Sequence, residues 1–257
     1  MKISVAIATF NEEKNIGPCL ETVKDWVDEI VVVDGNSQDK TRELAKKYGA
    51  RVIKTTNKPI FHLNKQMAID ACEGEWTLQL DADERVTLKL RDEILKTTKA
   101  KPEFNGFWIP RKNYFLGRFL KKGGQYPDYT LRLYKKGKGH LPCKSVHEQA
   151  EVKGKVGYLK NDLLHLADPN FSRYLLRFDR YTSLMADEME EKQVRLGLAS
   201  GFSYFLIKPV KWFLLAYFRH KGFKDGFPGF VFSLSSGLRF MIAYVKYWEK
   251  KTKGGEK

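Results

Sequence analysis

Three acidic side chains occur within four residues at the end of an apolar segment. The segment WTLQLDADER places Asp81, Asp83 and Glu84 directly after Trp76–Leu80. Acidic residues are common before a helix, because the helix dipole favours negative charge there, and helical spacing of apolar residues begins at Leu88. Closely placed carboxylates also suit Mg²⁺ or Mn²⁺, which take oxygen ligands and share them with phosphates. These residues alone leave both interpretations open.

Two further groups of polar residues follow apolar segments in the first hundred residues. Asn11 and Glu12 come after ISVAIAT (Ile3–Thr9), and Asp34 ends EIVVVD (Glu29–Asp34). Neither run shows the in–out alternation of a half-exposed strand, so we expect strands covered on both faces. The strands are expected at 3–9, 29–34, 51–55 and 76–80, with helices between them at 16–27, 40–48 and 61–71.

This β-α-β-α-β-α-β order predicts an α/β fold with a mostly parallel sheet flanked by helices. Ligands of such sheets bind beyond the carboxyl ends of the strands. Because all three polar groups follow strands, we expect them to meet at one edge of the sheet. Their residue types suit a divalent cation and a sugar nucleotide better than they suit stability.

The net charge is unevenly distributed along the 257 residues. The first 100 residues contain 16 Lys and Arg against 17 Asp and Glu, whereas the remainder contains 30 against 14. The basic part indicates an anionic partner: nucleic acid, acidic lipid or a phosphorylated substrate. The three cysteines have no CxxC spacing, which predicts reduced, buried thiols in a cytosolic protein. The N-terminus lacks the pattern of a signal peptide.

The composition changes after about residue 100, and again after about residue 170. Residues 101–166 combine Gly, Pro and short strand-like runs, which predicts a sheet extension that completes the site. We therefore expect an α/β domain at 1–166 and a helical extension at 167–257. The longest uncharged runs of that extension, 196–207 and 226–238, are shorter than the roughly 18 residues of a spanning helix. Their aromatic and basic neighbours favour helices lying on an anionic bilayer surface, with an ordinary helical core as the alternative.

Taken together, the segments ATFNEE, VVVDGNSQD and LQLDADE resemble the GT-A glycosyltransferases of family 2 over about residues 1–150. The segments GGQYPDYTLRLYKKGKG, SVHE and FKDGFPGFVF are similar to the lipopolysaccharide core β-glucosyltransferases of the WaaE/KdtX type. The resemblance implies a GT-A fold with a Rossmann-like sheet. It also implies inverting, metal-dependent transfer of a sugar from a nucleotide-sugar, such as a UDP-sugar, to a lipid-linked or lipopolysaccharide-core saccharide.

The resemblance also implies roles for particular residues on the donor side. Thr9 and Asp34 would hold the uracil or other nucleobase, Asp81 would lie near the ribose, and Asp83 would bind Mg²⁺ or Mn²⁺ bridging the diphosphate. Lys65 would lie near the diphosphate, unless it is only a solvated helix residue. The complete set of implied donor-site residues is Thr9, Asn11, Glu12, Asp34, Asn64, Lys65, Asp81 and Arg132.

Two carboxylates compete for the role of catalytic base. Related enzymes carry an Asp after a glycine-rich segment, and GGQYPD places Asp128 there, although Pro127 replaces the acid that usually precedes it. Glu148 of SVHE is the rival, and His147 beside it is a possible further metal ligand.

Two other functions are considered beside glycosyl transfer. A sugar-phosphate nucleotidyltransferase would carry a glycine-rich basic loop near its N-terminus, and ATFNEEKN has none. A non-catalytic nucleic-acid-binding protein would fit the charge but would not explain Asp34, Asp81 and Asp83 at strand ends. We expect a cytoplasmic enzyme bound peripherally to the inner face of the cell membrane, with no nucleic-acid partner.

Overall fold

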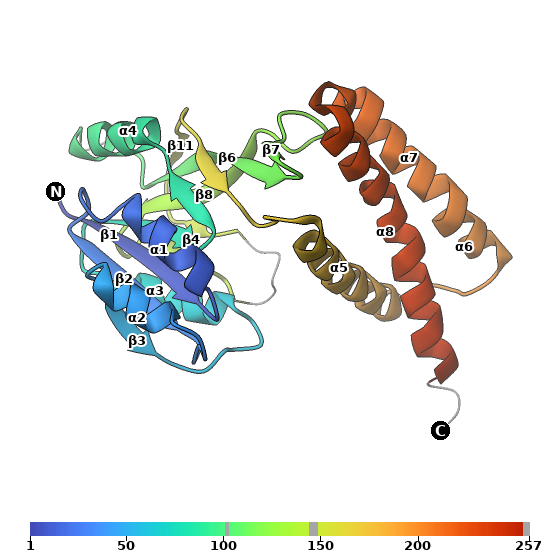
Figure 1. Ribbon diagram of the computed structural model, residues 1–257, viewed down its shortest axis with the longest axis horizontal. Coiled ribbons are helices and arrows are strands. Elements are labelled where there is room, and N and C mark those ends of the chain that lie inside the picture. Colours follow the sequence, from blue (N-terminus) through green and yellow to red (C-terminus); the bar gives the residue numbers. More distant parts are fainter. Residues whose placement is uncertain (101–102, 144–148, 254–257) are drawn as a thin grey trace. The chain divides into compact units, whose positions relative to one another are not determined.

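The computed structural model describes residues 1–100, 103–143 and 149–253, and the chain forms two compact units (Figure 1). The α/β unit consists of Met1–Arg111 and Asp128–His165, and the helical unit consists of Lys112–Pro127 and Leu166–Lys257. The division after His165 lies next to the boundary expected after residue 166. The inclusion of Lys112–Pro127 in the helical unit was not expected from the sequence.

The first half of the α/β unit alternates strands and helices, as expected. In chain order the elements are β1 (Ile3–Thr9), α1 (Glu13–Glu21), β2 (Glu29–Asp34), α2 (Thr41–Lys47), β3 (Arg51–Lys54), α3 (His62–Ala71) and β4 (Trp76–Asp81). Strands β3, β2, β1 and β4 are neighbours in that order and all run parallel. The structure thus confirms the predicted α/β class.

The later strands extend this sheet mainly with antiparallel neighbours. They are β5 (Glu84–Val86), β6 (Gly106–Phe115), β7 (Arg118–Phe119), β8 (Asp128–Lys135), β9 (Gly139–His140), β10 (Glu151–Val152), β11 (Val156–Tyr158) and β12 (Leu163–His165). The sheet order continues from β4 through β8, β6 and β12 to β5, while β9 and β10 pair separately. Strand β8 runs antiparallel to both β4 and β6, so the sheet is mixed. Its parallel half consists of the N-terminal strands β1 to β4. Among the later strands, β11 pairs with β6 in parallel.

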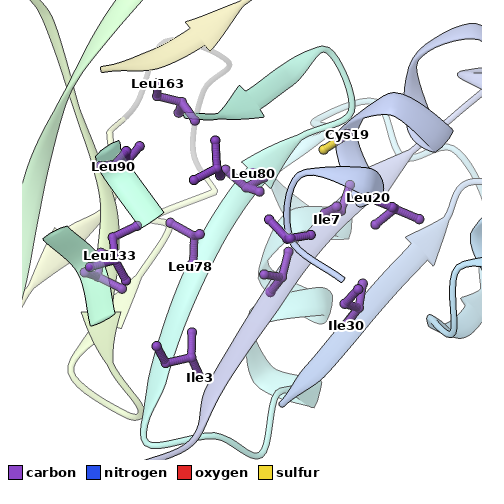
Figure 2. Packing of buried hydrophobic residues seen from close by; sticks show 14 of the residues in the cluster. Ile3, Ile7, Cys19, Leu20, Ile30, Leu78, Leu80, Leu90, Leu133 and Leu163 are labelled. Atoms are coloured by element: carbon purple, nitrogen blue, oxygen red, sulfur yellow. The ribbon is translucent and has the colours of Figure 1, made fainter. Parts of the chain in front are cut away.

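The core of the α/β unit explains why its strands show no alternation. Side chains on both faces of β1 and β2 are buried, in two separate clusters. Figure 2 shows Ile7, Leu20 and Leu80 packed together in the larger of these clusters. Because both faces of these strands are covered, neither face needs polar side chains, and no alternation results. Full burial of one of these apolar side chains contributes about 1.5–3 kcal/mol. Cys19 and Cys72 are buried free thiols, as expected, whereas Cys143 is only half-buried; burial raises the pKa of Cys72 to about 12.

The helix after the acidic cluster begins later than the dipole interpretation requires. The last acidic residue, Glu84, begins strand β5, and this strand separates the cluster from α4 (Leu88–Lys99), whose first turn contains no acidic residue. The side chain of Thr87 caps α4 by accepting a hydrogen bond from the N–H of Leu90 at 3.2 Å. The interpretation of the acidic cluster as helix N-terminal charge is therefore wrong.

The helical unit contains two long helical stretches that run antiparallel to each other, residues 198–219 and 226–253, and a further helix, residues 171–191. Its elements are α5 (Phe171–Glu191), α6 (Leu198–Phe202), η1 (Ser203–Ile207), α7 (Lys208–Leu214), η2 (Leu215–Arg219), η3 (Gly222–Asp225) and α8 (Gly226–Lys253). Both α5 and α7 pack along α8 (Figure 1). Ala243, Tyr244 and Tyr247 of α8 form a small core with Ala186 and Met189 of α5.

The helical unit exposes many large apolar side chains. Leu206, Ile207 and Phe218 are each at least half exposed, and Leu198 is 96% exposed. Within the described residues, the stretch Gly222–Thr252 is long and apolar enough to cross a bilayer, judged by length and composition alone. We expected every apolar run of the extension to be too short to span, and this stretch is long enough because its apolar character continues past single charged residues such as Arg239. A core helix of a soluble protein passes the same test.

Candidate active site

The parallel strands bring the expected polar groups to a common level at one edge of the sheet. The register pairs Thr9 at the end of β1 with Asp34 at the end of β2, and it pairs Ala8 with Asp81 at the end of β4. The three polar groups therefore converge as the β-α-β pattern predicts. This convergence follows from the backbone register and does not depend on how individual side chains are oriented.

Asp34 holds the loops after β1 and β2 together. Its carboxylate is fully buried, and it accepts hydrogen bonds from the backbone N–H of Ser37 at 2.9 Å and from the Ser37 hydroxyl at 2.5 Å. The Thr9 hydroxyl donates at 3.2 Å, and Nη1 of Arg42 forms an ion pair at 3.1 Å. Asp34 is thus a buried anion with several donors, which fixes the backbone at the edge of the sheet.

Asn11 and Glu12 lie in the β1–α1 loop and connect it to the loop that follows β2. Asn11 adopts a left-handed backbone with φ of 55°, and its N–H donates to the Ser37 hydroxyl at 2.8 Å. The N–H of Glu12 donates to the Thr41 hydroxyl at 2.8 Å, and the Glu12 carboxylate accepts from Asn15 at 2.7 Å. The two loops consequently form one connected backbone surface beside Asp34.

Asp81 is held ionised by two cations. Lys65 of α3 forms an ion pair with Oδ1, and Nη2 of Arg132 lies 2.5 Å from Oδ2. Burial would raise the pKa of Asp81, but the neighbouring charges of Arg132 and Lys65 outweigh it and hold the pKa well below its usual range. The described partners of the Arg132 guanidinium are Asp81 and Glu84, at 2.5 and 2.9 Å.

Asp83 faces a histidine that was not predicted from the sequence. Its Oδ2 lies 3.6 Å from Nε2 of His165, at the end of β12. Burial would raise the pKa of Asp83, yet the interaction with His165 keeps it below its usual value. His165 follows the apolar pair of an LLH segment, the same arrangement that places Asp81 after β4. That resemblance is too short to have identified His165 from the sequence alone.

Asn64 and Lys65 lie in the first turns of α3, beside the same edge. The amide of Asn64 donates to the carbonyl of Thr56 at 3.0 Å. Its Oδ1 is buried and has no hydrogen-bond partner within the part of the chain that the structure describes. Lys65 also lies over the ring of Phe61, at 4.9 Å from its centroid. Asn64 therefore offers a buried acceptor, and Lys65 offers a cation beside Asp81.

Asp128 begins β8 and is fixed by an arginine on the neighbouring strand. The β6–β8 register pairs it with Arg111, whose Nη2 and Nε donate to Oδ2 at 2.7 and 2.9 Å. Arg111 was not predicted from the sequence, and Glu84 was considered only as one member of the acidic cluster. The alternative base Glu148 and the possible ligand His147 lie outside the described residues. Among the residues that are described, no three His, Cys, Asp or Glu side chains form a group able to hold a metal ion.

Comparison with known proteins identifies similar chains. The family model described as "Glycosyl transferase family 2" matches residues 4–150. The lipopolysaccharide core biosynthesis glycosyltransferase LpsC of Rhizobium meliloti (strain 1021) is 28% identical, over 97% of this chain and 93% of that protein. An uncharacterized glycosyltransferase of Rickettsia typhi, RT0209, is 28% identical over 98% of this chain and 88% of its own.

Two solved structures share the fold. The mannosyltransferase PcManGT from Pyrobaculum calidifontis, in complex with GDP-Man and Mn²⁺, superposes with a TM-score of 0.56 at 14% identity, over 97% of this chain and 88% of that one. The structure of S. aureus TarS has a TM-score of 0.50 at 18% identity, over 97% of this chain and 54% of that one.

Proposed function

Because the chain belongs to glycosyl transferase family 2, we propose that it is an inverting, metal-dependent enzyme that transfers a sugar from a UDP-sugar to a lipid-linked saccharide. The observation that carries this proposal is the convergence of Thr9, Asp34 and Asp81 at one sheet edge, with Asp83 facing His165 beside them. Family membership favours glycosyl transfer over the nucleotidyltransferase and nucleic-acid-binding alternatives.

In the proposed reaction Asp128 acts as the general base. It takes the proton of an acceptor hydroxyl while a lone pair of that oxygen forms the new bond to the anomeric carbon. The bond from that carbon to the diphosphate oxygen breaks, and its electron pair leaves with the nucleoside diphosphate. Attack from the side opposite the leaving group inverts the anomeric configuration. Glu148 remains the alternative base.

Asp83 and His165 are the residues that would hold Mg²⁺ or Mn²⁺. A carboxylate and an imidazole 3.6 Å apart fit a cation that takes its other ligands from a diphosphate and water, as Mg²⁺ commonly does. The bound cation would neutralise charge that develops on the leaving diphosphate. His147 remains a possible further ligand. Asp81 is less suited to direct coordination, because both its oxygens already contact cations.

The donor nucleotide is proposed to lie along the loops of β1 and β2. The backbone that would hold the nucleobase is fixed by Thr9, Asn11, Glu12 and Asp34. The buried Oδ1 of Asn64 would accept a hydrogen bond from the donor, because it lacks one from the described protein. Lys65 would contact the diphosphate. Arg132 was expected there too, but its two carboxylate contacts support a positioning role.

The proposed acceptor and location follow from LpsC and from the surface of the helical unit. LpsC is a lipopolysaccharide core biosynthesis glycosyltransferase, which makes a lipid-linked core saccharide the favoured acceptor class. A shallow apolar groove runs along η1, α7 and η2; it is lined by Leu206, Ile207, Val210, Lys211, Leu214, Leu215, Phe218 and Arg219. Apolar and aromatic side chains flanked by cations fit the interface of an anionic bilayer. We therefore propose peripheral binding to the cytoplasmic leaflet.

Donor turnover tests the proposed function. The full-length protein is incubated with a panel of UDP-sugars and with GDP-mannose, each with Mn²⁺, and release of the nucleoside diphosphate is measured. Slow release from at least one UDP-sugar, abolished by excess chelator, is the expected result. Full activity in chelator would overturn the metal role, and turnover of GDP-mannose alone would overturn the choice of uridine.

A further inference from the structure

Six charged side chains of the α/β unit form a row in which positive and negative groups alternate. This ion-pair row consists of Lys65, Asp81, Arg132, Glu84, Arg111 and Asp128. Its middle contacts measure 2.5 Å from Arg132 to Asp81, 2.9 Å from Arg132 to Glu84 and 3.4 Å from Arg111 to Glu84. Three cations balance three anions, so the row as a whole carries no net charge at neutral pH.

Glu84 is the fully buried centre of this row. Its Oε1 contacts both Arg111 and Arg132, and its Oε2 accepts the backbone N–H of Asp81 at 2.9 Å. At 0% exposure, Glu84 cannot touch a substrate. A buried ion pair is often no more stabilising than well-packed apolar residues would be. A role in organising the neighbouring charges would account for a carboxylate at this position.

Accessibility increases towards the Asp128 end of the row. The side chain of Asp128 is 32% exposed, compared with 19% for Arg111 and 0% for Glu84. Arg111 donates from both Nε and Nη2 to the same oxygen, Oδ2. Two donors that converge on one carboxylate oxygen define the orientation of the carboxylate plane more narrowly than one donor does.

We propose that Arg111 and Glu84 are positioning residues for the base: Arg111 orients the Asp128 carboxylate, and Glu84 offsets part of the arginine's charge so that Asp128 can still accept a proton. The inference rests on the proposed role of Asp128. Among the described groups, Arg111 on β6 contacts Asp128 directly, while Glu84 on β5 contacts Arg111 and Arg132 on β8 contacts Glu84.

The physical argument is a balance between two opposing effects on the base. A lone arginine beside a carboxylate favours the charged form and weakens it as a proton acceptor. A second carboxylate on the same guanidinium reduces that effect, because the two carboxylates repel each other and this repulsion disfavours the charged form of the base. A general base works best when its proton affinity approaches the working pH, so Glu84 limits the loss of basicity that Arg111 alone would cause in Asp128.

The two positioning residues should move the pH profile of kcat in opposite directions. In Arg111→Met, loss of the cation lets Asp128 bind a proton more readily, so the acidic limb should move to higher pH and kcat should fall about tenfold or more. In Glu84→Gln, Arg111 acts on Asp128 without opposition, so the limb should move to lower pH while the plateau also falls. Arg111→Lys keeps the charge and should restore the position of the limb better than it restores kcat.

The experiment uses the full-length enzyme with a donor that it turns over, and it includes Asp128→Asn and Glu148→Gln as references. Arg51→Met is the matched control, because Arg51 forms a 2.7 Å ion pair with Glu29 outside the site. Its pH profile should equal that of the unmodified enzyme. The KM for the donor should change less than threefold in Arg111→Met, and thermal melting should show that each variant folds.

The outcomes separate the inference from the proposed function. If Asp128→Asn remains active while Glu148→Gln does not, the proposed base is wrong and the inference falls with it. If Asp128→Asn is inactive but Arg111→Met keeps the original limb and a kcat within about twofold, only the positioning role is overturned. Should Glu84→Gln fail to fold, Glu84→Asp, which keeps the charge, and the comparison of Arg111→Met with Arg111→Lys take its place; an unchanged limb in all of them would overturn the positioning role.

Discussion

The two units of this glycosyltransferase distribute charged and apolar side chains in opposite ways. In the α/β unit the apolar residues of β1, β2 and β4 are buried, and its conspicuous polar groups are carboxylates and cations paired at strand ends. In the helical unit the main ring-to-cation contacts place Lys208 and Arg239 over aromatic rings, and large apolar side chains face outward. One unit is built around a polar site and the other around an apolar surface.

This difference shows that burial and function are coupled differently in the two units. In the α/β unit, apolar burial holds the strand ends still, and the site depends on that rigidity. In the helical unit the exposed groups themselves are the functional surface that we propose. The same type of substitution should therefore affect stability in one unit and binding in the other.

The largest expected effect is loss of transfer on removing the proposed metal ligand. Asp83→Asn should lower kcat roughly 10²–10³-fold, the range for losing one electrostatic contact to the transition state. Asp92→Asn on α4, an exposed carboxylate paired with Arg91, is the control and should keep full activity. Turnover in saturating Mn²⁺ is the measurement. Full activity of the Asp83→Asn variant would show that Asp83 does not bind a cation needed for transfer.

A matched pair of leucine truncations tests the contrast in burial. Leu80→Ala removes a fully buried side chain of β4 and should lower the free energy of unfolding by about 2–5 kcal/mol. Leu206→Ala, at a residue 50% exposed, should change it by no more than about 0.5 kcal/mol. Urea unfolding of both variants measures the difference. Equal losses would mean that Leu206 belongs to a core and that the contrast between the units is false.

Vesicle binding tests whether the exposed face meets a bilayer. Replacing Leu206 and Phe218 by Asp should abolish flotation with anionic vesicles, since each inserted side chain contributes roughly 1.5–3 kcal/mol. Lys211→Gln should weaken binding by only about 1 kcal/mol and reduce its dependence on salt. Leu88→Asp is the control, because Leu88 is 70% exposed but belongs to the α/β unit. If the double variant floats as well as the original protein, the helical surface serves another partner.

The smallest expected effect concerns helix capping, where the two units should behave alike. Thr87 caps α4 of the α/β unit, and Asn170 caps α5 of the helical unit by accepting from the N–H of Arg173 at 2.9 Å. Thr87→Ala and Asn170→Ala should each reduce the free energy of unfolding by about 1 kcal/mol. Denaturant unfolding of both variants gives the values. A cap effect in one unit alone would show that the units do not unfold together.

The parallel half of the α/β unit could be predicted from the sequence because its signals are local. Apolar runs such as Ile3–Thr9 mark strands covered on both faces, and parallel pairing places polar residues after them at one edge. The same argument found Asp34, Asp81 and Asp83. Helix α1 ends at Glu21 rather than continuing to residue 27, yet Val23 is buried in the turn that follows.

The antiparallel half could not be predicted in the same way. The contacts of Asp83 with His165 and of Glu84 with Arg111 join residues far apart in the chain, and their pairing depends on the register of short strands. Strand β12 has only three residues, too few for any periodicity to identify it. Half of the proposed site could not be predicted because its residues lie far apart in the sequence, and not because their structural preferences are weak.

The assignment of Lys112–Pro127 to the helical unit has a consequence for protein engineering. Asp225 accepts hydrogen bonds from the N–H groups of Lys121 and Lys122 at 2.9 and 2.7 Å, so this internal segment is held by a residue more than a hundred positions later. A truncation near residue 200 would remove that acceptor and leave two backbone donors without it. A chimera that exchanges the helical unit between related enzymes must therefore carry two segments, one internal and one C-terminal, from the same parent.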